Sequence, residues 1–298
     1  MRDGEAPVVI VGAGFSGTMV AANLARLGLD SLLVDSKGRA GLGTAFSTED
    51  PAHLLNIPAD NMGAWPDSPG DFAASQGIRG ESYAERRHFG RYLRSILGQA
   101  LDSGHARLVE GRAVGAERDG KGWKVRIDDG ETLRAGALVL AIGNQPPAAI
   151  EAAEPAGRRL IGDPWGESAR AAIDDAAARQ LDVLVLGSSL TMVDVALSLE
   201  SAGHRARTLA LSRRGKVPLG NGIDEPSAVE WDQLPPPRIR AIAKWLRERS
   251  QSLGWRAAVD SLRPHSHRLW QSLPSDEKRR FLRFGRPWWD IHRHRIAP

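Results

Sequence analysis

The sequence predicts an α/β fold with two strand–turn–helix units, a small antiparallel insert and a helical C-terminal segment. Two short aliphatic runs, at residues 8–11 and 183–186, each lead into a glycine-containing turn and then into a stretch with helical periodicity. Between them, residues 123–127 alternate in polarity and are followed by a turn signal at Asp129-Gly130. The chain has 298 residues, 42% of them hydrophobic, which is enough for about two globular domains.

The first unit has every part of a Rossmann-like βαβ motif. The continuous aliphatic run at 8–11 is typical of a parallel strand buried on both faces. It is followed by the G-x-G-x-x-G of residues 12–17 and by a helical stretch that Gly28 closes as the residue after the C-cap. The next strand, at 32–34, ends in Asp35, which lies 21 residues beyond Gly14.

This arrangement favours dinucleotide binding over a glycine-rich turn without a ligand. Gly12 permits the tight turn, Gly14 lets the backbone approach a pyrophosphate, and Gly17 allows close packing of helix on strand. The helix N-terminus supplies free N–H donors for the phosphates. Asp35 can accept hydrogen bonds from an adenosine ribose.

The second unit is a weaker version of the same pattern. Gly187 follows the aliphatic run, but Ser189 and Met192 stand where the second and third glycines would be. The helix from residue 190 is expected to close at Gly203, and a strand at 209–211 precedes Ser212-Arg213-Arg214. Arginine at that strand end suits a ribose 2′-phosphate and therefore NADPH rather than NADH. The alternative is a structural βαβ repeat with a basic strand end.

The segment between the units is predicted to be a small antiparallel insert followed by one further strand. Residues 108–114 and 123–127 are expected to form antiparallel strands, and Asp129-Gly130 is a hairpin turn signal. A further buried strand at 137–142 ends at Gly143. This order is the layout of flavoproteins that bind two dinucleotides. We predict three parts: a flavin-binding domain at 1–160, a second nucleotide-binding-like unit at 161–230, and a basic, Trp-rich helical segment at 231–298.

At this point the sequence resembles FAD/NAD(P)-binding proteins of an uncharacterised bacterial branch related to flavin-dependent N-hydroxylases and Baeyer–Villiger monooxygenases. The fold expected from the resemblance is the two-dinucleotide-binding flavoprotein fold. The matching segments cover most of the chain and are residues 12–17, 41–46, 51–58, 89–93, 140–143, 187–194, 212–215 and 292–298.

The resemblance implies FAD and NADPH as cofactors and assigns residues to them. The ADP half of FAD would be held by Gly12, Gly14, Phe15, Ser16, Gly17, Asp35 and Ser36. The flavin side would be approached by Gly43, Thr44 and Ala45, and the isoalloxazine would be lined by Asn56 and Ile57. Val114 would contact adenine, Gly143 would mark the crossover between the sites, and NADPH would face Gly187, Ser189, Thr191, Arg213 and Arg214.

Members of this group continue beyond the segment that matches 292–298 and return to the flavin domain. We therefore expect a fragment, a short relative, or a chain whose flavin site is completed by a partner chain or by a second copy in a homo-oligomer.

Composition excludes several other classes of function. The chain holds no cysteine, which excludes a dithiol relay and a thiolate metal site. The two H-x-H pairs, at 265–267 and 292–294, have no carboxylate pair beside them, so no metal site is expected. Residues 231–298 carry 15 Lys/Arg against 6 Asp/Glu and six tryptophans, but no nucleic-acid-binding signature. No apolar run reaches membrane-spanning length and no secretory signal is evident, so a cytoplasmic protein is expected.

These observations favour an FAD-dependent oxidoreductase that uses NADPH to reduce its flavin, with monooxygenation of a small molecule as one reaction of this type. The sequence names no catalytic acid or base. The alternative is a non-catalytic nucleotide-binding or partner-binding relative that has lost turnover.

Overall fold

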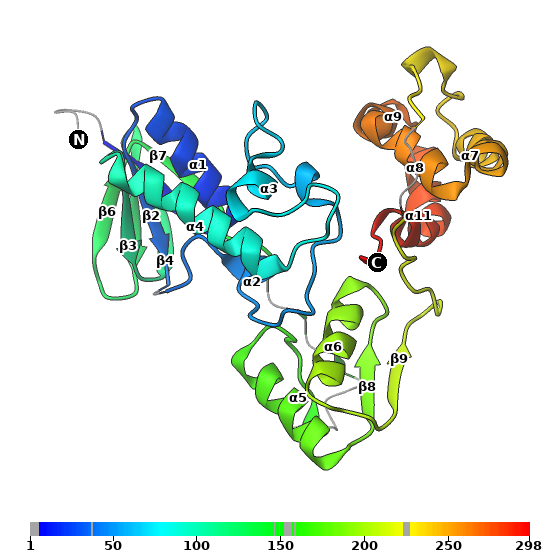
Figure 1. Cartoon of the computed structure of the whole chain (residues 1–298). Coiled ribbons are helices and arrows are strands. Elements are labelled where there is room, and N and C mark those ends of the chain that lie inside the picture. The colour runs from blue at the N-terminus through cyan, green and yellow to red at the C-terminus, as the bar shows by residue number, and fades with distance from the viewer. Residues whose placement is uncertain are drawn as a thin grey trace. The chain divides into compact units, whose positions relative to one another are not determined.

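The computed structural model describes residues 6–36, 38–145, 147–148, 150–151, 157, 159–222 and 227–298. The chain forms two compact units, residues 1–174 and 175–298, and α5 (Glu167–Arg179) contains the boundary between them (Figure 1). The finer division at residues 160 and 230 stays a prediction.

The first unit is built on a four-stranded parallel sheet with the order β3-β2-β1-β7. Aliphatic side chains on both faces explain why these short runs form a buried sheet, as the sequence predicts for β1 and β2. The strands pair in register from Val8 opposite Ser31 and Ala137. Their bounds are Val8–Val11 (β1), Ser31–Asp35 (β2), Ala106–Glu110 (β3) and Ala137–Leu140 (β7).

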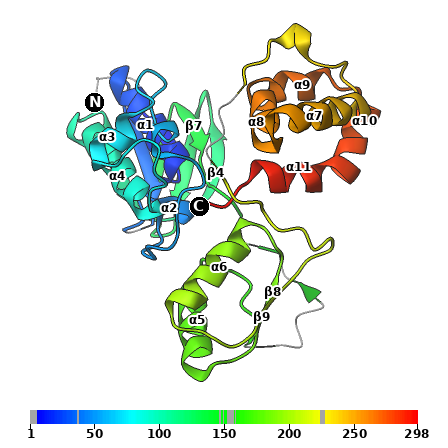
Figure 2. The ribbon, with the colours of Figure 1, turned by 45° about the vertical axis from the view of Figure 1, so that its right-hand side comes forward.

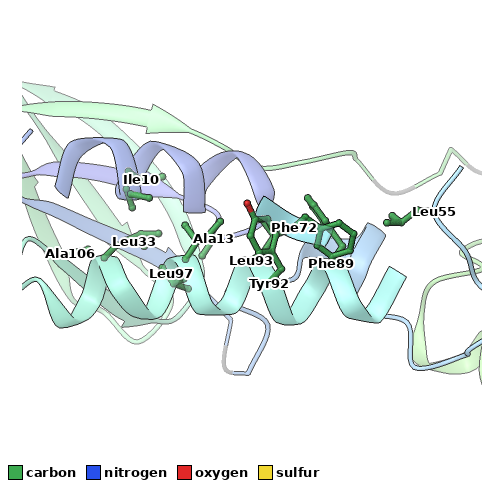
Figure 3. Close-up of a cluster of buried hydrophobic side chains, with 14 of the residues drawn as sticks. Ile10, Ala13, Leu33, Leu55, Phe72, Phe89, Tyr92, Leu93, Leu97 and Ala106 are labelled. Atoms are coloured by element: carbon green, nitrogen blue, oxygen red, sulfur yellow. The ribbon is translucent and has the colours of Figure 1, made fainter. Parts of the chain in front are cut away.

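Helices α1 (Phe15–Arg26) and α4 (Arg86–Asp102) pack on one face of this sheet. Ile10 and Leu33 point from the sheet into this layer, where Leu97 of α4 lies close to Leu33 (Figure 3). Leu93 and Phe89 continue the cluster along α4. The buried face of α4 continues through a cluster of rings that includes Phe72. This layer is the main core of the first unit.

The opposite face of the parallel sheet is covered by a three-stranded antiparallel sheet. It has the order β4-β5-β6 and comprises Ala113–Asp119, Gly122–Ile127 and Thr132–Ala135. Val9 and Val34 of the parallel sheet pack against Val125 and Ile127 of this insert. Gly130 adopts φ +93° in the turn between β5 and β6, which confirms the predicted hairpin.

The sequence prediction for residues 108–114 is only partly right. Residues 108–110 belong to β3 and pair in parallel with β2, whereas pairing with the antiparallel insert begins at Ala113. Gly111, at φ +153°, separates the two strands. The sequence pattern of residues 108–114 could not show that the chain changes sheets at this glycine.

Short elements connect β2 to α4 and lie close to the sheet's carboxyl edge. They are α2 (Gly43–Phe46), the single turn η1 (Ala59–Asn61) and α3 (Asp71–Gln76). The segment before η1 pairs with the entry to α4, because the N–H of Leu55 donates to the carbonyl of Ala84 at 2.8 Å. In α4, a methyl group at Gly90 would lie 2.7 Å from the carbonyl oxygen of Phe46, so glycine there lets α2 pack closely.

The second unit begins with a βαβ motif. Strands β8 (Val183–Leu186) and β9 (Thr208–Leu211) are parallel and flank α6 (Leu190–Ser201). Gly203 adopts φ +84° after α6, as predicted. Helices α5 and α6 lie on one side of the strands (Figure 2). The expected burial of β8 on both faces is wrong, because the alternate leucines of both strands are exposed: Leu184, Leu186, Leu209 and Leu211.

From residue 231 the second unit is mostly helical, as the sequence predicts. They are α7 (Ile239–Leu253), α8 (Trp255–Leu262), α9 (Ser266–Ser272), α10 (Ser275–Arg280) and α11 (Arg286–Arg293), with short turns η3 (Trp231–Gln233) and η4 (Arg263–His265) and the π-helical η5 (Phe281–Gly285). Ile242 and Leu246 of α7 pack on Ala258 and Leu262 of α8. No helix of the described residues is both long and apolar enough to cross a membrane.

Two further predictions about the strands and the chain's end are refined by the structure. The strand predicted at 137–142 ends at Leu140, and both Leu140 and Ile142 are exposed.

The matching segment at 292–298 contains Arg295, which is only 5% exposed. Its guanidinium donates to both carboxylate oxygens of Asp260, at 2.8 and 2.9 Å. This bidentate pair joins the end of the chain to α8.

Candidate functional site

The glycine-rich turn after β1 lies at the carboxyl edge of the parallel sheet. In the order β3-β2-β1-β7, the chain leaves β1 toward β2 on one side and later adds β7 on the other. Ligands of open α/β sheets bind in the crevice outside the carboxyl ends of the strands at such a switch point. The turn at residues 12–14 and Asp35 at the end of β2 both lie at this edge.

Gly12 and Gly17 are required by the local packing. Gly12 adopts φ +97°, and a methyl group there would lie 2.3 Å from the carbonyl oxygen of Ala141. A methyl group at Gly17 would lie 1.8 Å from the carbonyl oxygen of Gly12 and would also meet Ile10. The structure thus shows the tight turn and the close approach of helix to strand that the spacing predicts.

Gly14 and Gly43 bring two separate segments into contact. A methyl group on Gly14 would lie 3.4 Å from the Cα of Gly43, and one on Gly43, at φ +61°, would lie 3.2 Å from the Cα of Gly14. The residues predicted for the ADP half and for the flavin side therefore meet at this pair of glycines. The atoms nearest to this pair of glycines are all backbone atoms, so the two segments meet without side chains between them.

The N-terminus of α1 offers main-chain donors at the same place. Gly14 is the N-cap, no side chain caps the helix, and its first turn contains no acidic residue. The first N–H groups of a helix have no intrahelical partner and carry the positive end of the helix dipole. Ser16 and Phe15 are exposed in this turn, so the turn can receive a phosphate group.

Asp35 is bonded directly to the glycine-rich turn. Its Oδ2 accepts the N–H of Ala13 at 2.6 Å, and its Oδ1 accepts the N–H of Ser36 at 2.7 Å. Each carboxylate oxygen has a second lone pair, so both can still accept a ribose hydroxyl. The carbonyl of Ala13 in turn accepts the N–H of Gly41 at 2.7 Å. The predicted site residues did not include Ala13 or Gly41, although both belong to matching segments.

The remaining predicted flavin-site residues lie around this edge or farther along the chain. Ser36, Thr44 and Ala45 are exposed, while Asn56 and Ile57 are half-buried in the segment that precedes η1. Val114 is exposed on β4, and Gly143 follows β7 at φ +67°. Their contacts with FAD stay predictions.

The turn after β8 shows how the second predicted site is built. Gly187 adopts φ +118°, and no atom lies within 4 Å of where its Cβ would stand. The hydroxyl of Ser188 lies 2.7 Å from that of Ser212 and 2.5 Å from the carbonyl oxygen of Lys216. This contact, which the sequence did not indicate, ties the turn to the loop after β9.

The functional groups predicted for the second site differ in their surroundings. Ser189 and Thr191 are exposed at the start of α6, whose N-terminus has no side-chain cap. Arg213 and Arg214 are both exposed, but Arg214 donates to the carbonyl of Arg283 at 3.0 Å. Arg214 is therefore partly committed to holding the C-terminal helices. Met192 is half-buried on α6.

The shifted pKa values of Tyr92 and His88 are explained by burial and by neighbouring side chains. Burial and a hydrogen bond to Asp71 raise the pKa of Tyr92, whose hydroxyl also accepts the N–H of Ala64 at 3.0 Å. Burial lowers the pKa of His88 on α4, and Arg91 lowers it further. No catalytic acid or base emerges from these groups.

The histidine-rich segments also have structural contacts. His292 stacks on Trp288 with ring centroids 3.9 Å apart, and its Nδ1 lies 2.7 Å from the Trp288 carbonyl oxygen. Burial lowers its pKa. His265 bonds to the carbonyl of Val229 at 2.7 Å. The residues that the structure describes contain no group of three or more His, Asp or Glu side chains that could hold a metal ion.

Residues 9–145 match a protein-family model described as FAD-NAD(P)-binding. The chain matches no curated protein. Among solved structures it is similar to the peptidyl tryptophan dihydroxylase QhpG, with 27% identity over 49% of this chain and 34% of that one, at a TM-score of 0.34. It is also similar to cyclohexanone monooxygenase, with 20% identity over 83% of this chain and 44% of that one, at a TM-score of 0.48.

A third similar structure is thioredoxin reductase from Lactococcus lactis, with 22% identity over 72% of this chain and 58% of that one, at a TM-score of 0.47. In each of these three comparisons the match spans less than two thirds of the length of the solved structure.

Proposed function

We propose that this chain is an FAD-dependent oxidoreductase whose flavin is reduced by NADPH, since residues 9–145 match a family model described as FAD-NAD(P)-binding. The observation that carries the proposal is the glycine-lined edge where Gly12, Gly14, Gly17 and Gly43 meet the uncapped start of α1. We further propose that its substrate is a small molecule and that monooxygenation is the reaction.

The residues at this edge fit the ADP half of FAD. A pyrophosphate needs N–H donors and a backbone without side chains, and the turn at 12–14 with the first turn of α1 supplies both. A ribose needs an acceptor at the end of the second strand, where the Asp35 carboxylate is held by the Ala13 N–H. Ser36 follows directly and is exposed.

When bound, FAD supplies the electron-transfer chemistry, and the chain's residues supply binding and orientation. We call the glycine-rich turn at residues 12–14 the phosphate turn. The Gly14–Gly43 contact sets how closely residues 43–45 approach it. Phe46 of α2 packs on Phe89 of α4 with ring centroids 4.7 Å apart, which holds α2 in place. The flavin side of the cofactor is thereby assigned to a rigidly packed segment.

NADPH is assigned to the turn after β8. This turn resembles the first site in two respects: its first glycine has a positive φ, +118° at Gly187, and the start of α6 has no side-chain cap. The exposed guanidinium of Arg213 follows β9, the position where a charged side chain selects the 2′-phosphate. This supports NADPH over NADH as the reductant.

The spectrum of the purified chain tests the proposal. After addition of FAD and removal of excess cofactor, we expect yellow absorbance that bleaches when NADPH is added without oxygen. NADH should bleach it more slowly. A protein that stays colourless after addition of FAD would refute the proposal, and oxygen consumption linked to NADPH oxidation would support the monooxygenase reaction.

A second candidate is a non-catalytic nucleotide-binding or partner-binding protein. Two observations favour it: Met192 replaces the third glycine of the second turn, and Arg214 is engaged by the carbonyl of Arg283. Bound flavin that NADPH does not reduce under anaerobic conditions would identify this case, and rapid bleaching would exclude it.

A further inference from the structure

Arg94 on α4 contacts the loop that leads from Asp35 to Gly43. Its Nη2 donates to the carbonyl oxygen of Gly38 at 2.9 Å. Its stem packs on Gly41, where a methyl group would lie 2.7 Å from the Cγ and 3.1 Å from the Cα of Arg94. One side chain therefore holds this loop at two points.

The same loop is bonded to the phosphate turn. The N–H of Gly41 donates to the carbonyl of Ala13 at 2.7 Å, and the N–H of Ala13 donates to Asp35 at 2.6 Å. A series of contacts thus runs from Arg94 through Gly41 and Ala13 to the carboxylate assigned to the ribose.

The loop needs such a restraint because of its backbone. Gly38 adopts φ +74° and Gly41 φ +82°, conformations that glycine reaches easily but in which it loses much conformational freedom on ordering. A planar guanidinium with several N–H donors is well suited to fix a carbonyl, and its stem covers the adjacent glycine.

We propose that Arg94 is a positioning residue for the ADP half of FAD. It holds residues 38–41 against the phosphate turn, so that Ala13 and Asp35 are aligned before the cofactor arrives. The proposal rests on the proposed function, because it requires that FAD binds at this edge. Neither the glycine fingerprint nor the acidic residue after β2 indicates a role for α4.

The test compares three variants with the wild-type chain by titrating FAD and following the quenching of flavin fluorescence. Arg94→Met keeps the stem and removes the guanidinium, and Arg94→Lys keeps the charge. Arg91→Met is the matched control, because Arg91 is exposed on α4 one turn earlier. Competition with ADP shows whether an effect concerns the ADP half.

Arg94→Met should weaken FAD binding about tenfold, as expected for loss of a charged hydrogen bond in a preorganised site. The affinity of Arg94→Met for ADP should fall by the same factor. Arg94→Lys should recover part of the affinity for FAD, and Arg91→Met should bind FAD as tightly as the wild type. At saturating FAD, the rate of flavin reduction by NADPH should be unchanged in Arg94→Met. The thermal unfolding of the FAD-free variant should match that of the wild type.

Unchanged FAD affinity in Arg94→Met would overturn the proposal, as would an equal loss in Arg91→Met. If Arg94→Met does not fold, Arg94→Lys decides, since wild-type affinity for both FAD and ADP in that variant would also contradict the need for a guanidinium. A wild-type chain that binds no FAD would instead refute the proposed function, and this inference with it.

Discussion

The main-chain N–H of Ala13 donates a 2.6 Å hydrogen bond to Oδ2 of Asp35, which joins the glycine-rich turn to the end of the second strand. The acid at this position therefore orients the phosphate turn besides being available to a ribose. Its contribution to FAD binding should exceed that of a hydroxyl contact alone, because its removal also releases the turn.

Asp35→Ala should weaken FAD binding by about 10- to 100-fold, since it leaves a donor of the turn unsatisfied and removes the ribose acceptor. Asp35→Asn keeps one acceptor oxygen and should fall between this variant and the wild type. Fluorescence titration with FAD measures both. Asp102→Asn, at an exposed residue of α4, serves as the control, and equal affinity of Asp35→Ala and the wild type would contradict the assignment.

Gly14→Val should abolish FAD binding. The added Cβ would already lie 3.4 Å from the Cα of Gly43, and the two further methyl groups would occupy the space that the pyrophosphate needs. The measurement is flavin retained after gel filtration. Circular dichroism confirms that the variant is folded, and a folded Gly14→Val protein that still retains FAD would refute this site.

Gly17→Ala and Gly98→Ala should have opposite effects on stability, although both glycines lie in helices. At Gly17 the methyl group would lie 1.8 Å from the carbonyl oxygen of Gly12, so helix and strand would have to separate. At Gly98 of α4 no atom outside the helix's own backbone lies within 4 Å of where the added methyl group would stand. Alanine there should raise the free energy of unfolding by about 0.4–1 kcal/mol. Chemical denaturation of the FAD-free protein tests this, and equal stability of the two variants would contradict it.

The first unit could be predicted closely because its signals are local. The close packing of one βαβ motif requires glycine at residues 12 and 17, and the structure shows these close contacts. It also shows the Asp35 carboxylate bonded to the N–H of Ala13. The reach of Arg94 to Gly38 could not be predicted, because it joins residues 56 positions apart on different elements. Spacing within a motif carries no information on such a contact.

Burial was the property that local patterns predicted least well. The runs at 8–11 and 183–186 look alike in sequence, yet Ile10 is fully buried whereas Leu184 is 56% exposed. The difference arises because β1 lies between two neighbours in a four-stranded sheet covered on both faces, while β8 pairs only with β9 among the described strands. The number of strands in a sheet is set by distant parts of the chain.

Arg213 and Arg214 should separate by function when each is changed to serine. Arg213→Ser should raise the KM for NADPH by about tenfold or more, with the kcat and the KM for NADH nearly unchanged, because it removes a 2′-phosphate contact. Arg214→Ser removes the bond to the Arg283 carbonyl and should lower stability instead. Steady-state kinetics with both nucleotides and thermal unfolding measure the two effects. An unchanged preference for NADPH in Arg213→Ser would contradict its role.

His292 should make the second unit sensitive to mild acid. Burial lowers its pKa below the ordinary value of 6.5, and its ring stacks on Trp288. Because the folded-state pKa is below the unfolded value, its neutral form contributes full stability above about pH 6.5, and this contribution is lost as the pH falls. The free energy of unfolding of the wild type should therefore decrease below pH 6.5.

His292→Gln should lower stability at pH 8, since it removes the stacked ring, but should flatten the pH dependence below 6.5. Urea denaturation at several pH values from 8 to 5, followed by tryptophan fluorescence, measures both changes. His267→Gln is the matched control, because His267 is exposed on α9. A wild-type profile with the same slope as His292→Gln would show that protonation of His292 does not limit the stability of the folded state.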